Sequence, residues 1–234
     1  MKFFRFKQFQ ITDDRSAMKV GTDAVILGAW TQGDNPQLIL DIGCGSGLIS
    51  VMLAQRYFNA EIYGIEIDAE SVKDAQYNFQ HAPWSTHLYV VHQDIQSYKP
   101  NQKFDFIVSN PPFFKDSLFP EKEGRAGARH EQSLSIDDLL ESVARLLEKH
   151  GVFSLVFPYD RETELITKAG KLGLFPKRIL RTRNKPGAVI KRSFIDFSFA
   201  KQQSIANETF CIRNKDNVYS KEYQSLTTAF YLNF

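Results

Sequence analysis

The tetrapeptide Asn110-Pro111-Pro112-Phe113 offers the clearest chemistry in this 234-residue chain, and it closely follows an apolar run at 104–108. That run is short, aromatic and β-branched, which predicts a buried strand. Proline has no N–H and a fixed φ, so two prolines force the chain out of the sheet at Asn110. Ligands of open α/β sheets bind at the carboxyl ends of the strands. These four residues are therefore candidate catalytic residues.

The polar groups of this tetrapeptide suit a planar exocyclic amine. The Asn110 side-chain oxygen and the Pro111 carbonyl are two acceptors, and such an amine on a base or an amide offers two N–H donors. Holding both N–H groups loosens the nitrogen lone pair from ring conjugation and aims it at an electrophile. Phe113 can stack on the ring, a contact worth about 1–3 kcal/mol per base. A proline-rich turn without activity explains the same residues equally well.

The rest of the chain predicts the elements that would position this motif. Apolar runs indicate seven strands, near 37–42, 61–67, 87–91, 104–108, 152–157, 176–182 and 193–199. Helical spacing or capping signals indicate helices at 48–57, 69–80, 135–150 and 161–171, with a further helix in the tail at 217–234. This alternation predicts a Rossmann-like α/β fold, a mostly parallel seven-stranded sheet with helices on both faces.

The domain organisation is expected to be simple. Residues 1–35 form an N-terminal extension with an amphipathic strand and a short apolar helix, which Thr22 or Asp23 would cap. Residues 36–234 form a single α/β domain. The stretch from 111 to 133 is a long loop with few apolar residues at its end, and a loop of that length is usually functional.

A second motif lies between the first predicted strand and the first helix of the repeating pattern. Asp41 precedes three glycines at alternate positions, Gly43, Gly45 and Gly47, around Cys44. Glycines here allow φ > 0 and a close approach of a ligand to the backbone at a helix N-terminus. A dinucleotide site, a nucleotide-phosphate loop and a site for a nucleoside carrying an amino acid are all conceivable. The first requires G-x-G-x-x-G and the second Gly-Lys-Ser/Thr, and both patterns are missing from this loop.

Acidic residues at two further strand ends support the third alternative. Glu66 ends the second predicted strand, where its carboxylate can accept hydrogen bonds from both hydroxyls of a ribose. Asp94 and Ile95 follow the third strand and could contact an adenine edge, the first by its carboxylate and the second by packing.

Charge is unevenly distributed along the chain. Residues 1–150 carry 15 Lys and Arg against 20 Asp and Glu, whereas residues 151–234 carry 14 against 7. The span 171–192 holds eight basic residues and no acid, which predicts contact with phosphates. The candidates for RNA binding are Lys19, Arg125, Arg129, His130, Arg181, Arg183, Lys185, Lys191 and Arg192. Each of these charges taken alone is more typical of a solvated surface.

Other features restrict the class of protein. The two cysteines, Cys44 and Cys211, give neither a disulfide framework nor zinc spacing, and the histidines lack metal-ligand spacing. We expect no metal. No apolar run approaches the ~20 residues of a membrane span, and the N-terminus is too charged for a signal peptide. These observations predict a cytoplasmic protein, which we expect to be a monomer with no membrane partner.

The ordered motifs Asp41-x-Gly43-x-Gly45-x-Gly47, Glu66, Asp94-Ile95 and Asn110-Pro111-Pro112-Phe113 resemble those of class I S-adenosylmethionine-dependent methyltransferases. More narrowly, the chain is similar to the bacterial tRNA adenine-N6 methyltransferases that modify the adenosine 3′ of the anticodon of a valine tRNA. The narrower resemblance rests on Phe6-Lys7-Gln8-Phe9, Met18-Lys19-Val20-Gly21-Thr22-Asp23, Ala128-Arg129-His130-Glu131 and Phe230-Tyr231-Leu232.

This resemblance implies S-adenosylmethionine as cofactor and an anticodon stem-loop of tRNA as partner. It implies that Thr22, Asp23, Cys44 and Ile67 join the cofactor site, and that Asn110 borders it. Helix capping is an equal alternative for Thr22 and Asp23, and Cys44 is more typical of a small residue that fills space in the loop than of a nucleophile. Guanine-N2 methylation of rRNA, glutamine-N5 methylation of a protein and RNA binding without catalysis are the competing functions.

Overall fold

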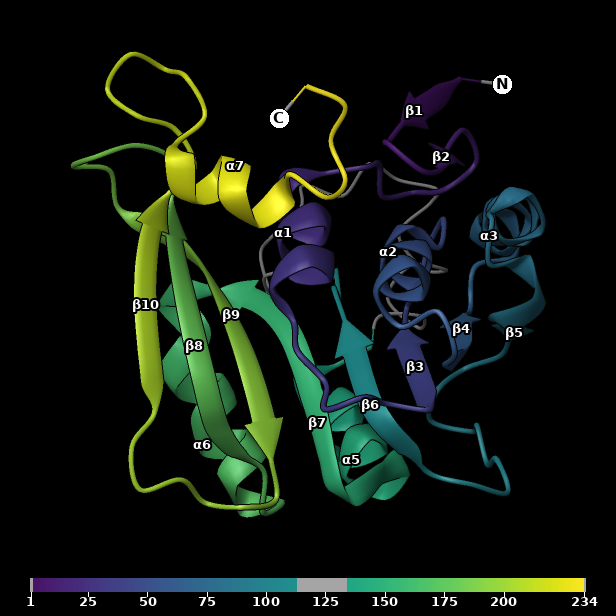
Figure 1. The fold of residues 1–234 in the computed structure, drawn as a ribbon. Helices are drawn as coiled ribbons and strands as arrows, with labels where there is room; N and C mark the ends of the chain where they lie inside the picture. The colour runs from purple at the N-terminus through teal and green to yellow at the C-terminus, as the bar shows by residue number, and fades with distance from the viewer. Residues whose placement is uncertain (1, 113–133, 234) are drawn as a thin grey trace, which may run out of the picture.

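The computed structural model describes residues 2–112 and 134–233, and its centre is an eight-stranded sheet in the order β10-β8-β9-β7-β6-β3-β4-β5 (Figure 1). Its strands are β3 (Leu38–Ile42), β4 (Glu61–Glu66), β5 (Leu88–His92), β6 (Phe104–Ser109), β7 (Leu147–Pro158), β8 (Phe175–Arg183), β9 (Ile190–Ser198) and β10 (Ala206–Cys211). All neighbours are parallel except β7 with β9 and β8 with β9. The predicted Rossmann-like α/β architecture is confirmed.

The predicted number of seven strands is wrong, because the sheet has an eighth strand, β10, at its edge. Every residue of β10 from Ala206 to Thr209 is exposed, and only Phe210 and Cys211 are partly buried. An edge strand with one partner shows no regular alternation of apolar and polar residues, so its sequence looks like a loop. Its parallel pairing with β8 lengthens the sheet beyond the seven predicted strands.

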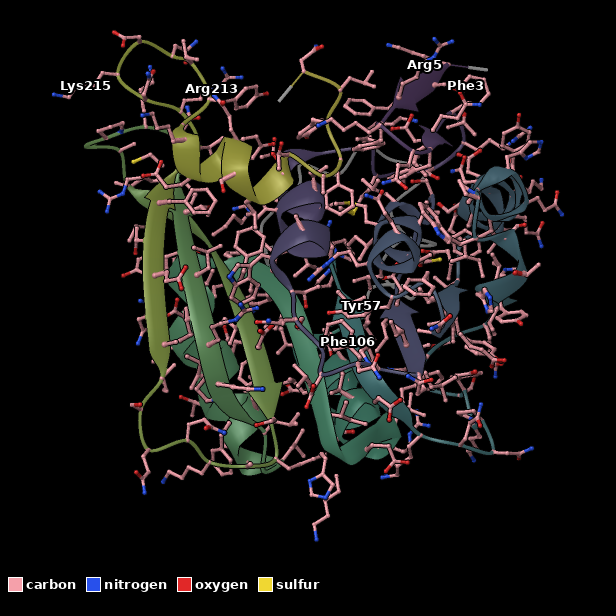
Figure 2. All side chains as sticks on the ribbon, in the orientation of Figure 1. Phe3, Arg5, Tyr57, Phe106, Arg213 and Lys215 are labelled. Atoms are coloured by element: carbon pink, nitrogen blue, oxygen red, sulfur yellow. The ribbon has the colours of Figure 1, made fainter. Side chains whose placement is uncertain are left out.

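Helices cover both faces of the sheet, as the alternating pattern predicts. Helices α1 (Thr22–Trp30), α2 (Leu48–Arg56) and α3 (Ala69–His81) contribute to one apolar core, and α5 (Ile136–Leu146) and α6 (Glu162–Lys171) to the other. The strands between them are buried on both sides, with Ile39 and Leu40 of β3 fully inaccessible. Figure 2 shows one contact of the first core, where the Tyr57 ring just beyond α2 meets Phe106 edge-on at a centroid distance of 6.4 Å.

Two helix boundaries differ from those expected. Helix α1 begins at Thr22, but its N-cap is Gly21, so neither Thr22 nor Asp23 caps it. Helix α5 ends at Leu146 and not near Gly151, because the chain passes directly into β7 at Leu147. A Cβ at Gly151 would lie 2.9 Å from the Asp105 carbonyl, so this glycine permits close strand packing and does not stop a helix.

The two ends of the chain meet on one side of the molecule (Figure 1). The hairpin of β1 (Phe3–Arg5) and β2 (Gln10–Thr12) lies beside the tail that follows α7 (Lys221–Thr227), the helix expected in the tail. The Lys7 N–H donates to the Phe230 carbonyl at 2.7 Å, and the Phe6 and Tyr231 rings stack at 5.7 Å. The aromatic residues at both termini therefore bind to each other.

Candidate active site

The carboxyl ends of the parallel strands bring the two main motifs to one edge of the sheet (Figure 1). In the pairing of β3 with its two neighbours, Ile42 lies opposite both Ile65 of β4 and Ser109 of β6. The glycine loop leaves β3 directly after Ile42, and Asn110 leaves β6 directly after Ser109. Adjacent strands lie about 4.8 Å apart. The two loops therefore begin side by side, as a shared site requires.

Left-handed backbone at three glycines shapes the loop between β3 and α2. Gly43, Gly45 and Gly47 have φ of 68°, 55° and 81°, values that residues with a Cβ rarely adopt. The N–H groups of Gly43 and Cys44 both donate to the Ile65 carbonyl, at 2.9 and 3.1 Å. These bonds fix the loop across the ends of two strands.

The space around the three glycines differs, which indicates which of them could border a ligand and which is required for packing. Among the described residues, a Cβ added at Gly43 or Gly45 would meet no atom within 4 Å. A Cβ at Gly47 would overlap Cε1 of Phe79 on α3. The first two glycines therefore leave their side of the loop open to a ligand, whereas Gly47 allows α3 to pack closely.

The Glu66 carboxylate is held by backbone donors beside this opening. Its Oε2 accepts from the Gly45 N–H at 2.9 Å, and its Oε1 accepts from the N–H groups of Ile67 and Asp68 at 2.8 and 2.9 Å. A carboxylate has about four acceptor positions, so Oε2 keeps room for a further donor. Glu66 thus both orders the glycine loop and offers a fixed acceptor.

Asp41, at the carboxyl half of β3, is a buried acid with an unsatisfied oxygen. Its Oδ2 accepts from the Ser50 N–H at 3.1 Å and the Ser50 hydroxyl at 2.7 Å, whereas its Oδ1 has no hydrogen-bond partner within the described part of the chain. Burial raises the pKa of Asp41 to about 7; the Ser50 bonds oppose this rise and the Glu66 charge adds to it. A buried oxygen without a partner costs free energy unless a ligand satisfies it.

The loop after β5, which carries Asp94 and Ile95, is held by hydrogen bonds from outside the sheet. Ile95 is buried, and the Asp94 carboxylate accepts from the Gln96 N–H at 2.9 Å. Arg145 of α5 donates to the carbonyls of Ile95, at 2.9 Å, and of Tyr98. Helix α5 therefore anchors the loop that presents Asp94.

Two further cofactor candidates occupy different positions. The Ile67 side chain is 41% exposed beside Glu66. The Cys44 thiol is buried against Gly64, where an added Cβ would lie 2.8 Å from its sulfur. Burial raises the pKa of Cys44 well above its ordinary value, with the Asp41 charge adding to the rise. A neutral, shielded thiol fills space and is not a nucleophile.

Asn110 has the environment that a positioned amide needs. It is partly buried, and its Oδ1 is shielded and has no hydrogen-bond partner in the residues described. The preceding Ser109 hydroxyl donates to the Ile42 carbonyl at 2.9 Å, which locks the end of β6 to the start of the glycine loop. Pro111 is buried and Pro112 exposed, and Phe113 lies outside the described residues.

The structure pairs Asp23 with one of the predicted RNA-binding residues. Arg192 Nε donates to Asp23 Oδ2 at 2.7 Å, with both side chains about 30% exposed. The pair links the first turn of α1 to β9. Thr22, next to it, is partly buried at the start of α1.

The span 171–192 has no acid in sequence but meets acids in space. Arg181 forms a bidentate ion pair with Glu162, with N–O distances of 2.6 and 2.8 Å, and Arg178 forms an ion pair with Asp196 at 2.8 Å. Arg178, Arg181 and Arg192 are therefore held by acids from other elements, and contact of the basic run with phosphates stays a prediction. Elsewhere, Lys19 donates to the Asp13 and Asp14 carbonyls. Arg125, Arg129 and His130 lie outside the described residues.

The remaining basic candidates lie near the site edge, by which we mean the edge of the sheet where the parallel strands have their carboxyl ends. Lys185 and Lys191 are exposed, and Arg183 is partly buried, where its Nε has no hydrogen-bond partner within the described ranges. All three lie at or beside the turn between β8 and β9, at the carboxyl end of β8.

Arg181→Ala is expected to lower the free energy of unfolding by about 3 kcal/mol, because breaking a largely buried pair leaves a charge unpaired. Burial favours a higher pKa for Glu162, but hydrogen bonds from Arg181 and Ser193 outweigh it and keep that pKa below its usual value. Urea unfolding measures the loss. The control is Arg183→Ala, two residues along the same strand, which should cost less; equal losses would contradict the structural role of the Arg181 pair.

Asn78 of α3 is a positioning residue that the sequence analysis did not identify. It is 1% exposed, its Oδ1 accepts from the Thr12 N–H at 2.9 Å, and its Nδ2 donates to the carbonyls of Thr12 and Ser46, at 2.7 and 2.8 Å. One turn earlier, Asp74 accepts from the Arg15 N–H at 2.8 Å. Asn78 therefore joins the N-terminal hairpin to the glycine loop. The available signal was two polar residues four apart on the face of α3 that also carries Phe79.

The described residues hold neither a membrane-spanning helix nor a cluster of metal ligands. None of the described helices is long and apolar enough to cross a membrane. No cluster of three or more His, Cys, Asp or Glu side chains in the described parts could hold a metal ion.

Comparison with solved structures places the fold among methyltransferases. A predicted O-methyltransferase from Agrobacterium tumefaciens aligns over 89% of this chain and 96% of its own, with a TM-score of 0.67 at 18% identity. A TehB-like S-adenosylmethionine-dependent methyltransferase from Corynebacterium glutamicum aligns over 78% and 89%, with a TM-score of 0.50 at 17% identity. At such identities the likeness defines the fold alone.

The sequence identifies the family. Residues 19–166 match the model of the methyltransferase small domain, and the chain belongs to that family. A protein of Bacteroides fragilis is 44% identical over 98% of this chain and 98% of its own length, and one of Flavobacterium psychrophilum is 40% identical over 98% and 99%. Photorhabdus laumondii has another, 40% identical over 98% and 95%. All three are named tRNA1(Val) (adenine(37)-N6)-methyltransferase.

Proposed function

We propose that this protein uses S-adenosylmethionine to methylate N6 of the adenosine at position 37, just 3′ of the anticodon, in a valine tRNA. The observation that carries the proposal is the adjacency of the glycine loop and Asn110 on two paired strands. Relatives that match the whole chain are named for this activity. We expect the protein to work in the cytoplasm, as a monomer, on the anticodon stem-loop.

The residues around the glycine loop fit this cofactor. When bound, S-adenosylmethionine supplies an electrophilic methyl group attached to a sulfonium. The open side of Gly43 and Gly45 has room for a ligand, and Glu66 Oε2 retains capacity for a ribose hydroxyl. The unsatisfied Asp41 Oδ1 is an acceptor that suits an ammonium group. A neutral ligand would leave this acid without compensation.

Three more residues are assigned to the cofactor. Asp94, whose loop is anchored by Arg145, is assigned to the exocyclic amine of adenine, and the apolar Ile95 to its ring. Ile67 adds exposed apolar surface beside the ribose-binding Glu66. These assignments follow from the common edge at which the strands end.

At the acceptor, the protein acts by orientation. Asn110 Oδ1 and the Pro111 carbonyl accept the two N–H groups of the adenine amine, which aims its lone pair. Correct orientation can be worth several kcal/mol of barrier. A strong general base is not required, because the amine becomes acidic as it is methylated. The target base must first turn out of the folded RNA, at a cost of a few kcal/mol.

The direct test of this function is incubation with total tRNA and labelled S-adenosylmethionine, followed by analysis of the nucleosides. The expected product is N6-methyladenosine, located at position 37 of valine tRNA. In parallel incubations with rRNA and with total protein, labelled N2-methylguanosine or labelled glutamine would replace the proposed substrate by another. Absence of cofactor binding would leave only an RNA-binding module.

Cofactor affinity is expected to fall below pH 7. Asp41 has a pKa of about 7 in the free protein, and a cation beside its Oδ1 favours the ionised form. Binding must then release the proton, so the dissociation constant should rise by up to about tenfold per pH unit below 7 and level off above it. Calorimetric titration between pH 6 and 8 measures this dependence. In Asp41→Asn the slope should disappear; a flat profile for the unaltered protein would contradict the contact.

A further inference from the structure

Two loops at the carboxyl ends of β8 and β10 leave the sheet side by side. The last residues of these parallel strands, Arg183 and Cys211, are paired. Beyond them, the Ile212 N–H donates to the Arg183 carbonyl at 2.9 Å and the Arg213 N–H to the Asn184 carbonyl at 2.8 Å. The loops at 184–189 and 213–218 therefore form one joined surface, which we call the paired-loop surface.

The loop at 213–218 is closed by its own hydrogen bonds. The Asn214 N–H donates to the Val218 carbonyl at 2.8 Å, and the Val218 N–H donates to Asn214 Oδ1 at 3.0 Å. Arg213 lies over the Tyr219 ring at 4.1 Å. Figure 2 shows Arg213 and Lys215 on this loop, which rises above α7. The positive charges of the loop are thus carried on an ordered turn.

The neighbouring loop at 184–189 is also a turn, with the Ala188 N–H donating to the Lys185 carbonyl at 3.0 Å and Gly187 at φ 80°. Its Lys185 is exposed, and Val189 is 72% exposed. With its flanks, the surface carries five basic residues against two acids, Asp216 and Glu222; the basic residues are Lys185, Lys191, Arg213, Lys215 and Lys221. Such a surface fits a polyanion.

The position of this surface relative to Asn110 suits a helical stem. In the sheet order, β8 is three strands from β6, and β10 is four. At about 4.8 Å per strand, the paired-loop surface lies roughly 14–19 Å along the site edge from the strand that carries Asn110. A B-form DNA duplex advances about 3.4 Å per base pair and an A-form RNA stem advances less, so this span corresponds to at least about four base pairs.

We propose that the paired-loop surface binds the phosphate backbone of the RNA stem that adjoins the methylated loop. This inference rests on the proposed function, and it divides the basic run. Lys171 and Lys177 belong to the opposite edge of the sheet, since one ends α6 and the other lies near the start of β8. Arg181 and Arg192 are engaged in ion pairs. Of the basic run, Lys185 and Lys191, at and beside the turn between β8 and β9, contribute to the surface together with the loop after β10.

The test is the double variant Lys185→Glu/Lys215→Glu, with Lys171→Glu/Lys201→Glu as a control of equal charge change at the other edge. The measurement is the dissociation constant for tRNA by fluorescence anisotropy across a salt series. We expect the first variant to bind about 10- to 100-fold more weakly at 0.1 M salt, with the slope of log affinity against log salt reduced by about two. The control should stay near the unaltered protein, and cofactor affinity should not change.

Two outcomes overturn the inference while the function stands. In the first, N6-methyladenosine forms and the two double variants bind tRNA with equal affinity. In the second, N6-methyladenosine forms and the Lys185→Glu/Lys215→Glu variant keeps its affinity for tRNA but no longer binds anionic lipid vesicles. If the unaltered protein makes no N6-methyladenosine in tRNA but the first variant alone loses RNA binding, the function fails and the surface stands. In an active enzyme, the KM for tRNA should rise with kcat little changed.

Discussion

Asn110→Ala is expected to reduce kcat for tRNA methylation by about 10²- to 10³-fold, the usual loss when a positioned polar group at a reacting centre is removed. The Asn110 Oδ1 is shielded and has no hydrogen-bond partner among the described residues, so it can accept a hydrogen bond from the adenine amine. Without it, the amine keeps a single acceptor, the Pro111 carbonyl, and its lone pair is no longer aimed. Cofactor affinity should stay within about twofold, because the glycine loop is held by β4 and not by Asn110. Single-turnover kinetics and calorimetry measure the two quantities.

Two matched variants make this prediction specific. Asn110→Asp keeps an acceptor oxygen, so it should retain part of the activity. Asn101→Ala removes the same amide from an exposed residue before the start of β6, at the opposite end of the strand, and should leave kcat unchanged. Full activity in Asn110→Ala would remove this residue from the mechanism. A parallel loss of cofactor binding would instead indicate that Asn110 holds the cofactor.

The fold and the core of the site were predictable because their signals are local. The buried strand at Leu38–Ile42 is an apolar run interrupted by Asp41 alone, and the three glycines that follow at alternate positions indicate a loop with left-handed backbone. Parallel order then follows from the alternation of strands and helices, and it places Glu66 and Asn110 at one edge without any knowledge of coordinates. Each of these predictions depends only on residues that are close together in the sequence.

The ion pairs of the basic run could not be predicted, for the opposite reason. Arg178 and Arg181 appeared free because no acid lies near them in sequence, yet Asp196 comes from the antiparallel strand β9 and Glu162 from the start of α6. Such partners are fixed by sheet order, which charge counts along the chain cannot reveal. The same holds for Asn78, whose hydrogen bond to Thr12 spans 66 residues. β10 escaped prediction because an exposed edge strand lacks a buried face.

Glu66→Ala is expected to weaken S-adenosylmethionine binding by about 100-fold. A hydrogen bond to a charged acceptor contributes about 1.5–3 kcal/mol, and the variant would lose those to the ribose hydroxyls. It would also release the N–H groups of Gly45, Ile67 and Asp68, which Glu66 holds at 2.8–2.9 Å, so the loop would lose order that binding must then restore. Calorimetric titration gives the dissociation constant, and thermal unfolding shows whether the fold persists.

The control for this change lies on the same strand. Glu61, at the opposite end of β4, is exposed and accepts from the Tyr63 hydroxyl at 3.2 Å, so Glu61→Ala should leave cofactor affinity unchanged. Glu66→Gln keeps one acceptor oxygen but adds donors that oppose the backbone N–H groups, and its affinity should fall between those of Glu66→Ala and the unaltered protein. If Glu66→Ala bound the cofactor within twofold of the unaltered protein, the carboxylate would serve only to order the loop, and the ribose would have to be held by other residues.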